Sequence, residues 1–260
     1  MAVGSRQKAE ATWRGETLSS LPTAYCPNSS SPHPNQPIFI SDALFPRFRQ
    51  FRAHAMLIPT VMDLRPIAHW VTRHLEDIEH EQRVARIAST LFDLTAPMHK
   101  LDPRARNLLR AAALVHDVGR CVTKSEHPAE GARMVLRDDD LRLPDHDRRA
   151  LAFLTFYHRD GLPRRGAEKL LRDAHDRPSM RKMLGLLRAA DALDSRSLES
   201  PQLVFGIRKR RVHVACYLRD ISGKARRVYL RRKKFQLLEE ELGCEVNVDV
   251  RSAEALTLVA

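Results

Sequence analysis

The spacing of apolar residues predicts helices from about residue 62 to residue 200. Apolar side chains recur every three or four positions in this stretch, and strand-like alternation is absent. Asp102 followed by Pro103 indicates a capped helix start, and Gly119 indicates a stop. We predict six helices, which begin near residues 76, 102, 125, 145, 166 and 179. This part of the chain is therefore expected to fold as an all-α domain.

The apolar period changes from 3.6 to 2 after Pro201. Apolar residues alternate with more polar ones from Val212 to Leu218 and predict a strand. Residues 225–231 are expected to form the return strand, residues 232–242 a short helix closed by a glycine, and residues 244–250 a last strand. The predicted fold class is thus mainly α, with a small α+β module after the helical domain.

Composition places the chain among globular proteins, with 43% hydrophobic and 29% charged residues. The first 42 or so residues are rich in Ser and Pro and lack periodicity, which indicates a disordered tail or translated sequence upstream of a start at Met56 or Met62. We divide the chain into a disordered tail (1–55), the helical domain (56–200) and the module (201–260). No apolar run approaches the ~18 residues of a membrane helix, and the four cysteines lie far apart without a CxxC pair. We expect a cytoplasmic protein with no membrane partner.

Positive charge is concentrated in one segment of the module. The net charge is +12, and the segment from Arg208 to Lys234 holds twelve Lys or Arg against one acid, Asp220. Such a segment favours a polyanionic partner, although a solvated face without any ligand explains the same charge. His213, Tyr217 and Tyr229 are expected on its strands, where they would stack on the bases of an RNA. The candidate polyanion-binding residues are Arg208, Lys209, Arg210, Arg211, Arg226, Arg227, Arg231 and Arg232.

Three His-Asp pairs occur in the chain, but only one of them ends an apolar helix. His116-Asp117 follows the run LLRAAALV, whereas the two later pairs lie in charged surroundings. Asp191 falls on the apolar stripe of the last predicted helix, and His80 on that of the first. Polar groups buried without partners cost free energy, and a metal ion is one natural solution. A salt bridge from Asp191 to Arg188, and a hydrogen-bonded core histidine at position 80, are the structural alternatives.

The order His80, His116-Asp117, Asp191 resembles the HD superfamily of metal-dependent phosphohydrolases. The likeness covers roughly residues 76–200, in helix context and spacing as well as residue identity. The stretches LLRAAALVHDVGR, FYHRDGLP and LLRAADALDSR resemble the C-terminal HD domain of the exopolyphosphatase / guanosine pentaphosphate phosphatase (Ppx/GppA) family. The resemblance implies an HD-type helical domain followed by that family's small terminal module.

The resemblance also implies a set of site residues. A first divalent metal (Mn, Mg, Fe or similar) would be held by His80, His116, Asp117 and Asp191, with His116 and Asp117 as the catalytic pair. A second ion would use His127 and His158, although both histidines are explained equally well as surface or loop residues. The candidate phosphate contacts are Lys124, Arg159, Arg188 and Arg196, each also explained as a solvated charge.

We hypothesise a metal-dependent phosphohydrolase that acts on a nucleotide, polyphosphate or other phosphate-rich substrate. The alternative is a non-catalytic HD module that binds metal or nucleotide, together with polyphosphate or RNA, in a regulatory role. In the full-length family the phosphatase site lies in two N-terminal actin-like domains, and their glycine-rich phosphate loops are absent from these 260 residues. Polyphosphatase activity is therefore not carried over from the resemblance, and the sequence leaves a homodimer open.

Overall fold

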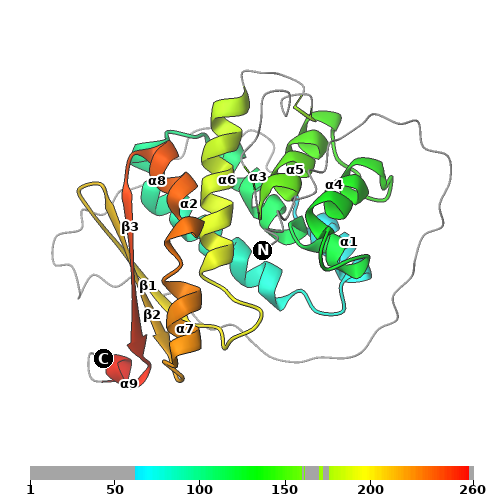
Figure 1. Cartoon of the computed structure of the whole chain (residues 1–260). Coiled ribbons are helices and arrows are strands. Elements are labelled where there is room, and N and C mark those ends of the chain that lie inside the picture. The colour runs from blue at the N-terminus through cyan, green and yellow to red at the C-terminus, as the bar shows by residue number, and fades with distance from the viewer. Residues whose placement is uncertain (1–61, 160, 162–169, 172–175, 258–260) are drawn as a thin grey trace, which may run out of the picture.

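A computed structural model describes residues 62–159, 161, 170–171 and 176–257, and its element order is mainly helical with a small sheet near the C-terminus (Figure 1). The helical domain contains α1 (Arg65–His74), α2 (Glu79–His99), α3 (Pro103–Val115), η1 (Val118–Cys121), α4 (His127–Arg137), α5 (Asp145–Tyr157) and α6 (Arg177–Ala192). The module contains β1 (Gln202–Arg208), β2 (Arg211–Leu218), α7 (Gly223–Tyr229), η4 (Arg232–Lys234), α8 (Gln236–Leu242), β3 (Glu245–Ser252) and α9 (Glu254–Thr257). The predicted fold class is confirmed.

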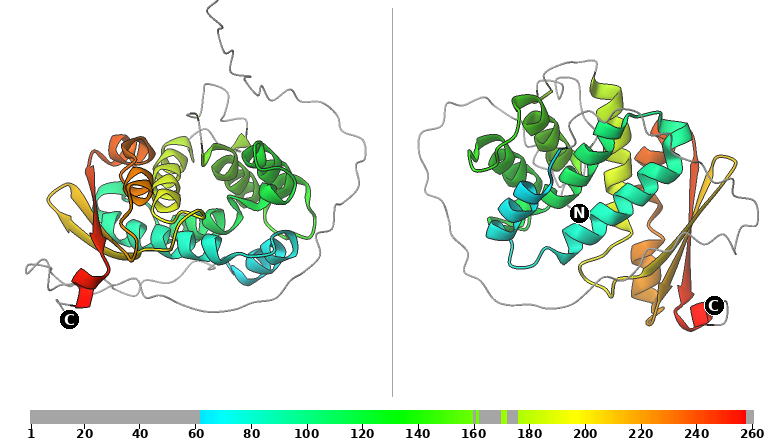
Figure 2. Two further views of the ribbon diagram at one scale, coloured as in Figure 1. Left: turned by 60° about the horizontal axis from the view of Figure 1, so that its bottom comes forward. Right: turned by 180° about the vertical axis from the view of Figure 1, so that it is seen from behind.

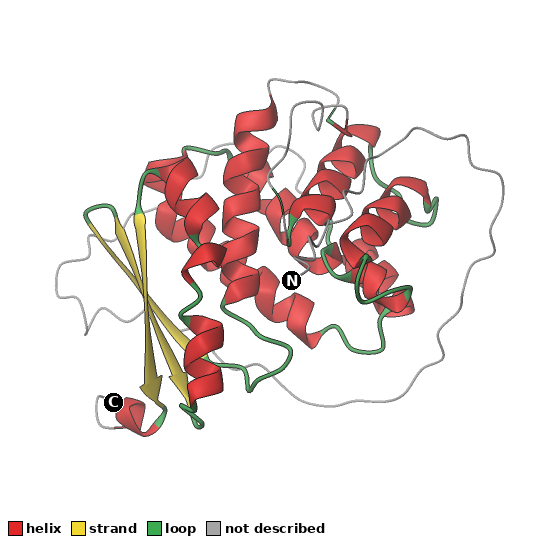
Figure 3. Cartoon of the chain, viewed as in Figure 1, coloured by secondary structure: helices red, strands yellow, loops and turns green. Residues whose placement is uncertain are grey.

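The three strands form one sheet in the order β1-β2-β3. β1 and β2 are an antiparallel hairpin, with Phe205 opposite Val214, and β3 runs parallel to β2, with Val248 beside Val214. The parallel pairing requires a crossover, which α7, η4 and α8 supply. Figures 1 and 3 show α7 and α8 between the sheet and α6, so the crossover joins the module to the helical domain.

The long helices α2 and α6 of the helical domain both pack against α8 of the crossover. α8 packs along α6, and the views of Figure 2 keep the sheet at one side of the molecule with the helical domain at the other. One continuous apolar core runs through both parts, from Trp70 and Leu109 in the helical domain to Phe205 and Tyr229 in the module. None of the described helices is long and apolar enough to cross a membrane.

Local signals in the sequence explain several element boundaries. The Asp102 side chain accepts a hydrogen bond from the Ala105 amide at 2.8 Å, with Pro103 at the first helical position, as predicted for α3. Gly243 ends α8 with a φ of 57°, a left-handed conformation that favours glycine. Helix α5 spans the residues expected for the fourth helix.

The return strand predicted for residues 225–231 is wrong, because this segment is helix α7. Ser222 caps it, and Ala225 and Tyr229, four residues apart, are the buried pair. Two buried residues at that spacing fit a helical period, which the surrounding arginines obscure. Tyr229 is fully buried and Tyr217 is 4% exposed, so neither offers a stacking surface.

Other differences concern element bounds. The helix predicted for 232–242 is divided into η4 and α8, and α1 and β1 are elements that the sequence analysis did not predict. Most of the fifth predicted helix (166–173) and all of the predicted tail (1–55) lie outside the described residues. The division into tail, helical domain and module therefore stays a prediction.

Candidate metal centre

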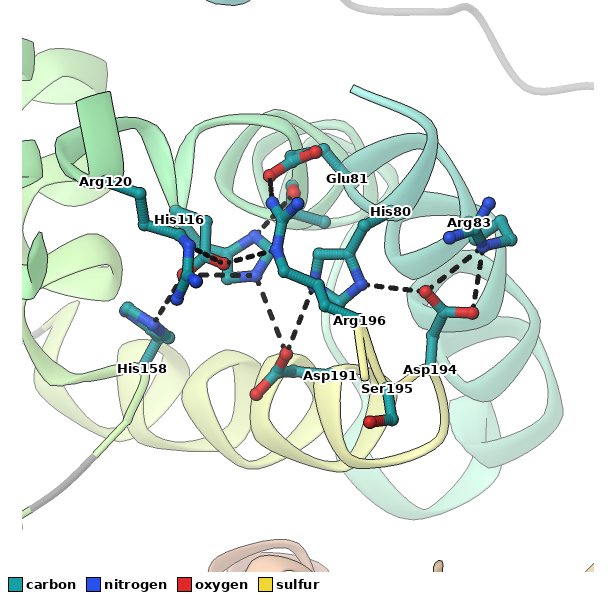
Figure 4. Close-up of polar contacts among 12 residues, drawn as sticks. His80, Glu81, Arg83, His116, Arg120, His158, Asp191, Asp194, Ser195 and Arg196 are labelled. Carbon is teal, nitrogen blue, oxygen red and sulfur yellow. Dashed lines mark hydrogen bonds and ion pairs between the residues drawn. The ribbon is translucent and has the colours of Figure 1, made fainter. Parts of the chain in front are cut away.

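Three segments far apart in the sequence bring histidines and carboxylates together. His80 lies in the first turn of α2, His116 and Asp117 directly follow α3, and Asp191 lies in the last turn of α6 (Figure 4). The Asp191 Oδ1 atom is 3.4 Å from His80 Nε2 and 3.6 Å from His116 Nε2. The structure thus gathers all four residues that the resemblance implied for the first metal.

The second group of predicted residues surrounds Asp117. Its Oδ1 atom is 3.0 Å from His127 Nε2 and 3.4 Å from His158 Nε2. His127 begins α4 and His158 follows α5, and both are buried rather than on the surface. Asp117 therefore lies between the two histidine groups.

Three imidazoles are oriented in the same way by their own backbone. The Nδ1 atom of His116 is 2.8 Å from the Ala113 carbonyl, and His127 and His158 make the same bond to the carbonyl three residues earlier, at 2.9 and 2.7 Å. Because a carbonyl accepts only, Nδ1 carries the proton and Nε2 of the neutral ring has a free lone pair directed into the cluster. A histidine that ligates a metal through one ring nitrogen typically donates the N–H of the other to a carbonyl or carboxylate in this way.

The strongest sign of a missing partner is the Nε2 atom of His116. The residue is 0% exposed, and this atom has no hydrogen-bond partner among the described residues. Two groups of donor atoms lie within 4.8 Å of one another: one from His80, His116 and Asp191, and one from His116, Asp117 and His158. Imidazole nitrogens with carboxylate oxygens suit divalent transition metals, so the residues fit one or two such ions.

Charge within the cluster shifts the pKa of its members in opposite directions. Burial opposes the charged form of His116, but the negative charges of Asp117 and Asp191 outweigh it and raise the pKa of His116 to about 9. Burial also opposes ionisation of the two carboxyl groups, but the neighbouring imidazoles hold the pKa of both well below its usual range. Asp117 and Asp191 are therefore ionised at neutral pH, the form that binds a cation.

Further residues hold the cluster from outside: the sequence analysis missed Asp194 and Glu81, and it named Arg196 only as a phosphate contact. Asp194 Oδ2 accepts from His80 Nδ1 at 2.7 Å, and Oδ1 of the same carboxylate accepts from Arg83 Nε at 2.9 Å (Figure 4). The fully buried Glu81 pairs with Arg196, whose Nε also donates to Asp117 Oδ2 at 2.9 Å. Asp194 follows Asp191 by about one helical turn, and this spacing is the feature of the sequence from which Asp194 could have been identified.

A cleft of about 570 Å³ opens onto the cluster and is lined mainly by basic residues. Three of the predicted phosphate contacts, Lys124, Arg159 and Arg196, line it. Arg188 lines a neighbouring cavity and donates to the carbonyls of Tyr157 and Gly161. The Asp191–Arg188 salt bridge considered as an alternative does not form, because Arg188 points to these carbonyls and Asp191 to His80 and His116.

Residues 64–214 match the family model "Ppx/GppA phosphatase, domain III", which covers more than half of the chain. The chain belongs to the Ppx/GppA phosphatase family. A guanosine-5'-triphosphate,3'-diphosphate pyrophosphatase of Aeromonas hydrophila subsp. hydrophila is 31% identical over 91 residues. That match covers 35% of this chain and 18% of the relative, so the chain spans less than one fifth of the relative's length.

The Ppx/GppA match ends inside β2, so most of the basic segment lies beyond it. Among the candidate polyanion-binding residues, Arg227 and Arg231 line the cleft. Arg226, one position from Arg227, does not. The residues of the β1–β2 hairpin (Arg208, Lys209, Arg210 and Arg211) do not line it either.

Several of these basic side chains have structural partners instead. Arg210 Nε donates to the Gly243 carbonyl at 2.5 Å and closes the end of α8, and Arg211 pairs with Glu245 at 2.7 Å. Arg232 pairs with Glu239 at 2.5 Å. The basic segment is therefore divided between residues that stabilise the module and residues that face the cluster.

Proposed function

We propose that the chain is a metal-dependent phosphohydrolase that cleaves phosphate ester or anhydride bonds of a nucleotide or another phosphate-rich small molecule. Membership of the Ppx/GppA family supports the reaction class. The observation that carries the proposal is the buried, unpartnered Nε2 of His116 beside two ionised carboxylates. Buried polar atoms are nearly always hydrogen-bonded, so an imidazole nitrogen without a partner that faces two carboxylates supports a cation site.

His80, His116, Asp117 and Asp191 would hold one divalent ion, and His127 and His158 would join Asp117 for a second. When bound, the metal supplies Lewis-acid polarisation of a phosphoryl oxygen and lowers the pKa of a water molecule. Arg196 holds the other carboxylate oxygen of Asp117, so that Oδ1 stays directed at the imidazoles. Lys124 and Arg159, which line the cleft, would bind phosphoryl oxygens through charge-assisted hydrogen bonds.

The decisive experiment measures metal content by elemental analysis together with phosphate release. The full chain would be purified and offered a panel of nucleotides, polyphosphate and simple phosphate esters with Mn²⁺ or Mg²⁺. We expect bound metal and turnover in the wild type, and in His116→Ala a loss of metal and a decrease in turnover of at least about 100-fold.

The chain provides a matched control for this experiment. His146 also begins a His-Asp pair, but its contact is a surface Asp176 at 3.7 Å. His146→Ala should therefore leave metal content and turnover unchanged. A metal-free wild type that hydrolyses nothing under either ion would overturn the proposal.

The bond from Arg196 to Asp117 favours one alternative function. A guanidinium already neutralises one oxygen of that carboxylate, which suits a module that binds metal or nucleotide without turnover. Equilibrium dialysis with nucleotide and Mn²⁺ tests this: binding without phosphate release supports the regulatory module, whereas phosphate release supports the enzyme.

A further inference from the structure

Four basic residues of the module form a stripe that faces the candidate metal centre. Lys224, Arg227, Arg231 and Lys234 follow one another at intervals of three, four and three residues along α7 and η4. Lys224 and Arg227 share one face of α7, whereas Arg231 lies in the non-helical link before η4 and Lys234 ends η4. All four line the same cleft as His80, Asp117 and Asp191, so the stripe is a wall of that cleft.

Among the described residues, three of the four charges of this cationic stripe have no acidic partner. Within the part of the chain that the structure describes, Lys224, Arg227 and Arg231 form no side-chain hydrogen bond or ion pair. Lys234 approaches Asp191, with Nζ 3.5 Å from Oδ2. Other arginines of the module do have carboxylate partners, so unpaired charge is not general in this segment.

The rest of the cleft lining does not neutralise the stripe. Arg120, Lys124, Arg159 and Arg196 also line the cleft, and the acids of the lining, such as Asp191, belong to the metal-ligand cluster. Like charges gathered around one cleft repel one another and destabilise the fold. Such an arrangement is typical of a site that binds an anion, because the bound anion removes the repulsion.

We propose that the cationic stripe binds the non-reacting phosphate groups of the substrate and so selects substrates with two or more phosphates over simple monoesters. Lys234, which contacts Asp191, places one end of the stripe at the candidate metal centre. A phosphate at the cluster would then have its neighbouring phosphates beside Arg231, Arg227 and Lys224. The position of the reacting phosphate rests on the proposed function, whereas anion binding by the stripe does not.

Direct binding tests the stripe without turnover. Isothermal titration of the full chain with inorganic tripolyphosphate and with orthophosphate should show markedly tighter binding of tripolyphosphate. Arg227→Gln should weaken tripolyphosphate binding about tenfold, the usual loss for one hydrogen bond to a charged group. Lys224→Gln should act in the same direction.

Arg226→Gln is the matched control, because it removes the same charge from the adjacent position of α7 without touching the cleft. We expect its tripolyphosphate affinity to stay within about twofold of wild type at constant salt. Equal losses in Arg226→Gln and Arg227→Gln would overturn the inference, since only the net charge of the module would then matter. Tighter binding of a short single-stranded RNA than of tripolyphosphate through Arg227 would also overturn it.

Kinetics separate the stripe from the proposed function. In an active enzyme, Arg227→Gln should raise KM for tripolyphosphate about tenfold and leave KM for p-nitrophenyl phosphate unchanged. Equal effects on both substrates would overturn the stripe and leave the hydrolase standing. If no substrate is turned over but tripolyphosphate binding still depends on Arg227, the proposed function fails and the stripe is supported.

Discussion

At the scale of single residues, the histidines of the cluster owe their orientation to the helix ends on which they lie. His116, His127 and His158 each bond the carbonyl three residues earlier, so the backbone fixes which nitrogen faces the cluster. His80 instead depends on the Asp194 side chain, from the other end of the helical domain. The centre therefore combines local backbone bonds with one long-range carboxylate.

The Glu81–Arg196 pair gives a first prediction. Glu81 is fully buried, and its Oε2 atom has no partner among the described residues. Arg196→Met should lower the free energy of unfolding by about 3 kcal/mol, because it leaves a buried carboxylate unpaired. The double variant Glu81→Gln/Arg196→Met should be more stable than Arg196→Met alone, as urea unfolding would show. A double variant at least as unstable as the single one would mean that the ion pair is not the source of the loss.

A second prediction concerns acid stability at Asp138. The Trp70 indole donates to Asp138 Oδ2 at 2.8 Å, and the Asp140 amide also donates to this carboxylate. Burial raises the pKa of Asp138, but these two hydrogen bonds outweigh burial, so the pKa is lowered. The stabilisation that the ionised Asp138 carboxylate contributes is fully present above the pKa of an aspartate in the unfolded chain, about 3.9. It is lost as the pH falls through the lower pKa that Asp138 has in the folded protein.

Asp138→Asn keeps an acceptor for Trp70 but removes the charge, so it isolates this effect. Unfolding followed by tryptophan fluorescence should show a smaller stability difference between pH 5 and pH 2.5 in the variant than in the wild type. Wild type should exceed the variant by about 1 kcal/mol at pH 5. Parallel pH profiles for the two proteins would contradict the prediction.

The sequence could predict the residues of the cluster but not their supports. Polar groups on apolar helix faces stand out in a helical pattern, which is why His116, Asp117 and Asp191 were identified. Arg196, Asp194 and Lys234 look like ordinary charged residues, since their meaning depends on tertiary contacts from separate segments.

At the scale of elements, close backbone contact determines where His127 lies. Gly119 of η1 packs directly on the backbone of α4, at His127 and Gly131. Helix periodicity predicted both α3 and α4, but no sequence pattern shows that two glycines from adjacent elements touch. The strand predicted at 225–231 was wrong for a similar reason. Ala225 and Tyr229 indicate a helix only once their packing in the folded protein shows that these two residues are buried.

The glycine contact gives a third prediction. A Cβ atom at Gly119 would overlap the His127 carbonyl oxygen and the Gly131 amide, both of which are backbone atoms. Gly119→Ala should therefore lower the free energy of unfolding by about 3 kcal/mol, because backbone must move. Gly223→Ala is the control: its nearest neighbour would be an Arg227 side-chain nitrogen at 3.6 Å. Equal stability of the two variants in urea unfolding would show that η1 and α4 do not need this contact.

At the scale of the whole molecule, the candidate site depends on how the module docks on the helical domain. The metal-ligand candidates come from the helical domain, whereas the cationic stripe comes from the module. The contact between α6 and α8 joins them, with Gly185 against the backbone of Leu238 and Arg181 bonded to Glu241 at 2.6 Å. A change at this contact, none of whose residues lines the cleft, should therefore shift one half of the site relative to the other.

Gly185→Val tests that dependence. A Cβ atom at position 185 would lie 2.9 Å from Leu238 Cα, so the larger side chain must push α8 and the attached η4 away from α6. We expect a loss of about 2 kcal/mol in unfolding free energy and tripolyphosphate binding weakened by about tenfold. Metal content should be unchanged, because His80, His116, Asp117 and Asp191 all precede the module. Loss of metal and tripolyphosphate binding together would instead mean that the module also holds the helical domain in its binding form. Unchanged tripolyphosphate affinity would mean that the stripe binds without close docking of α8 on α6.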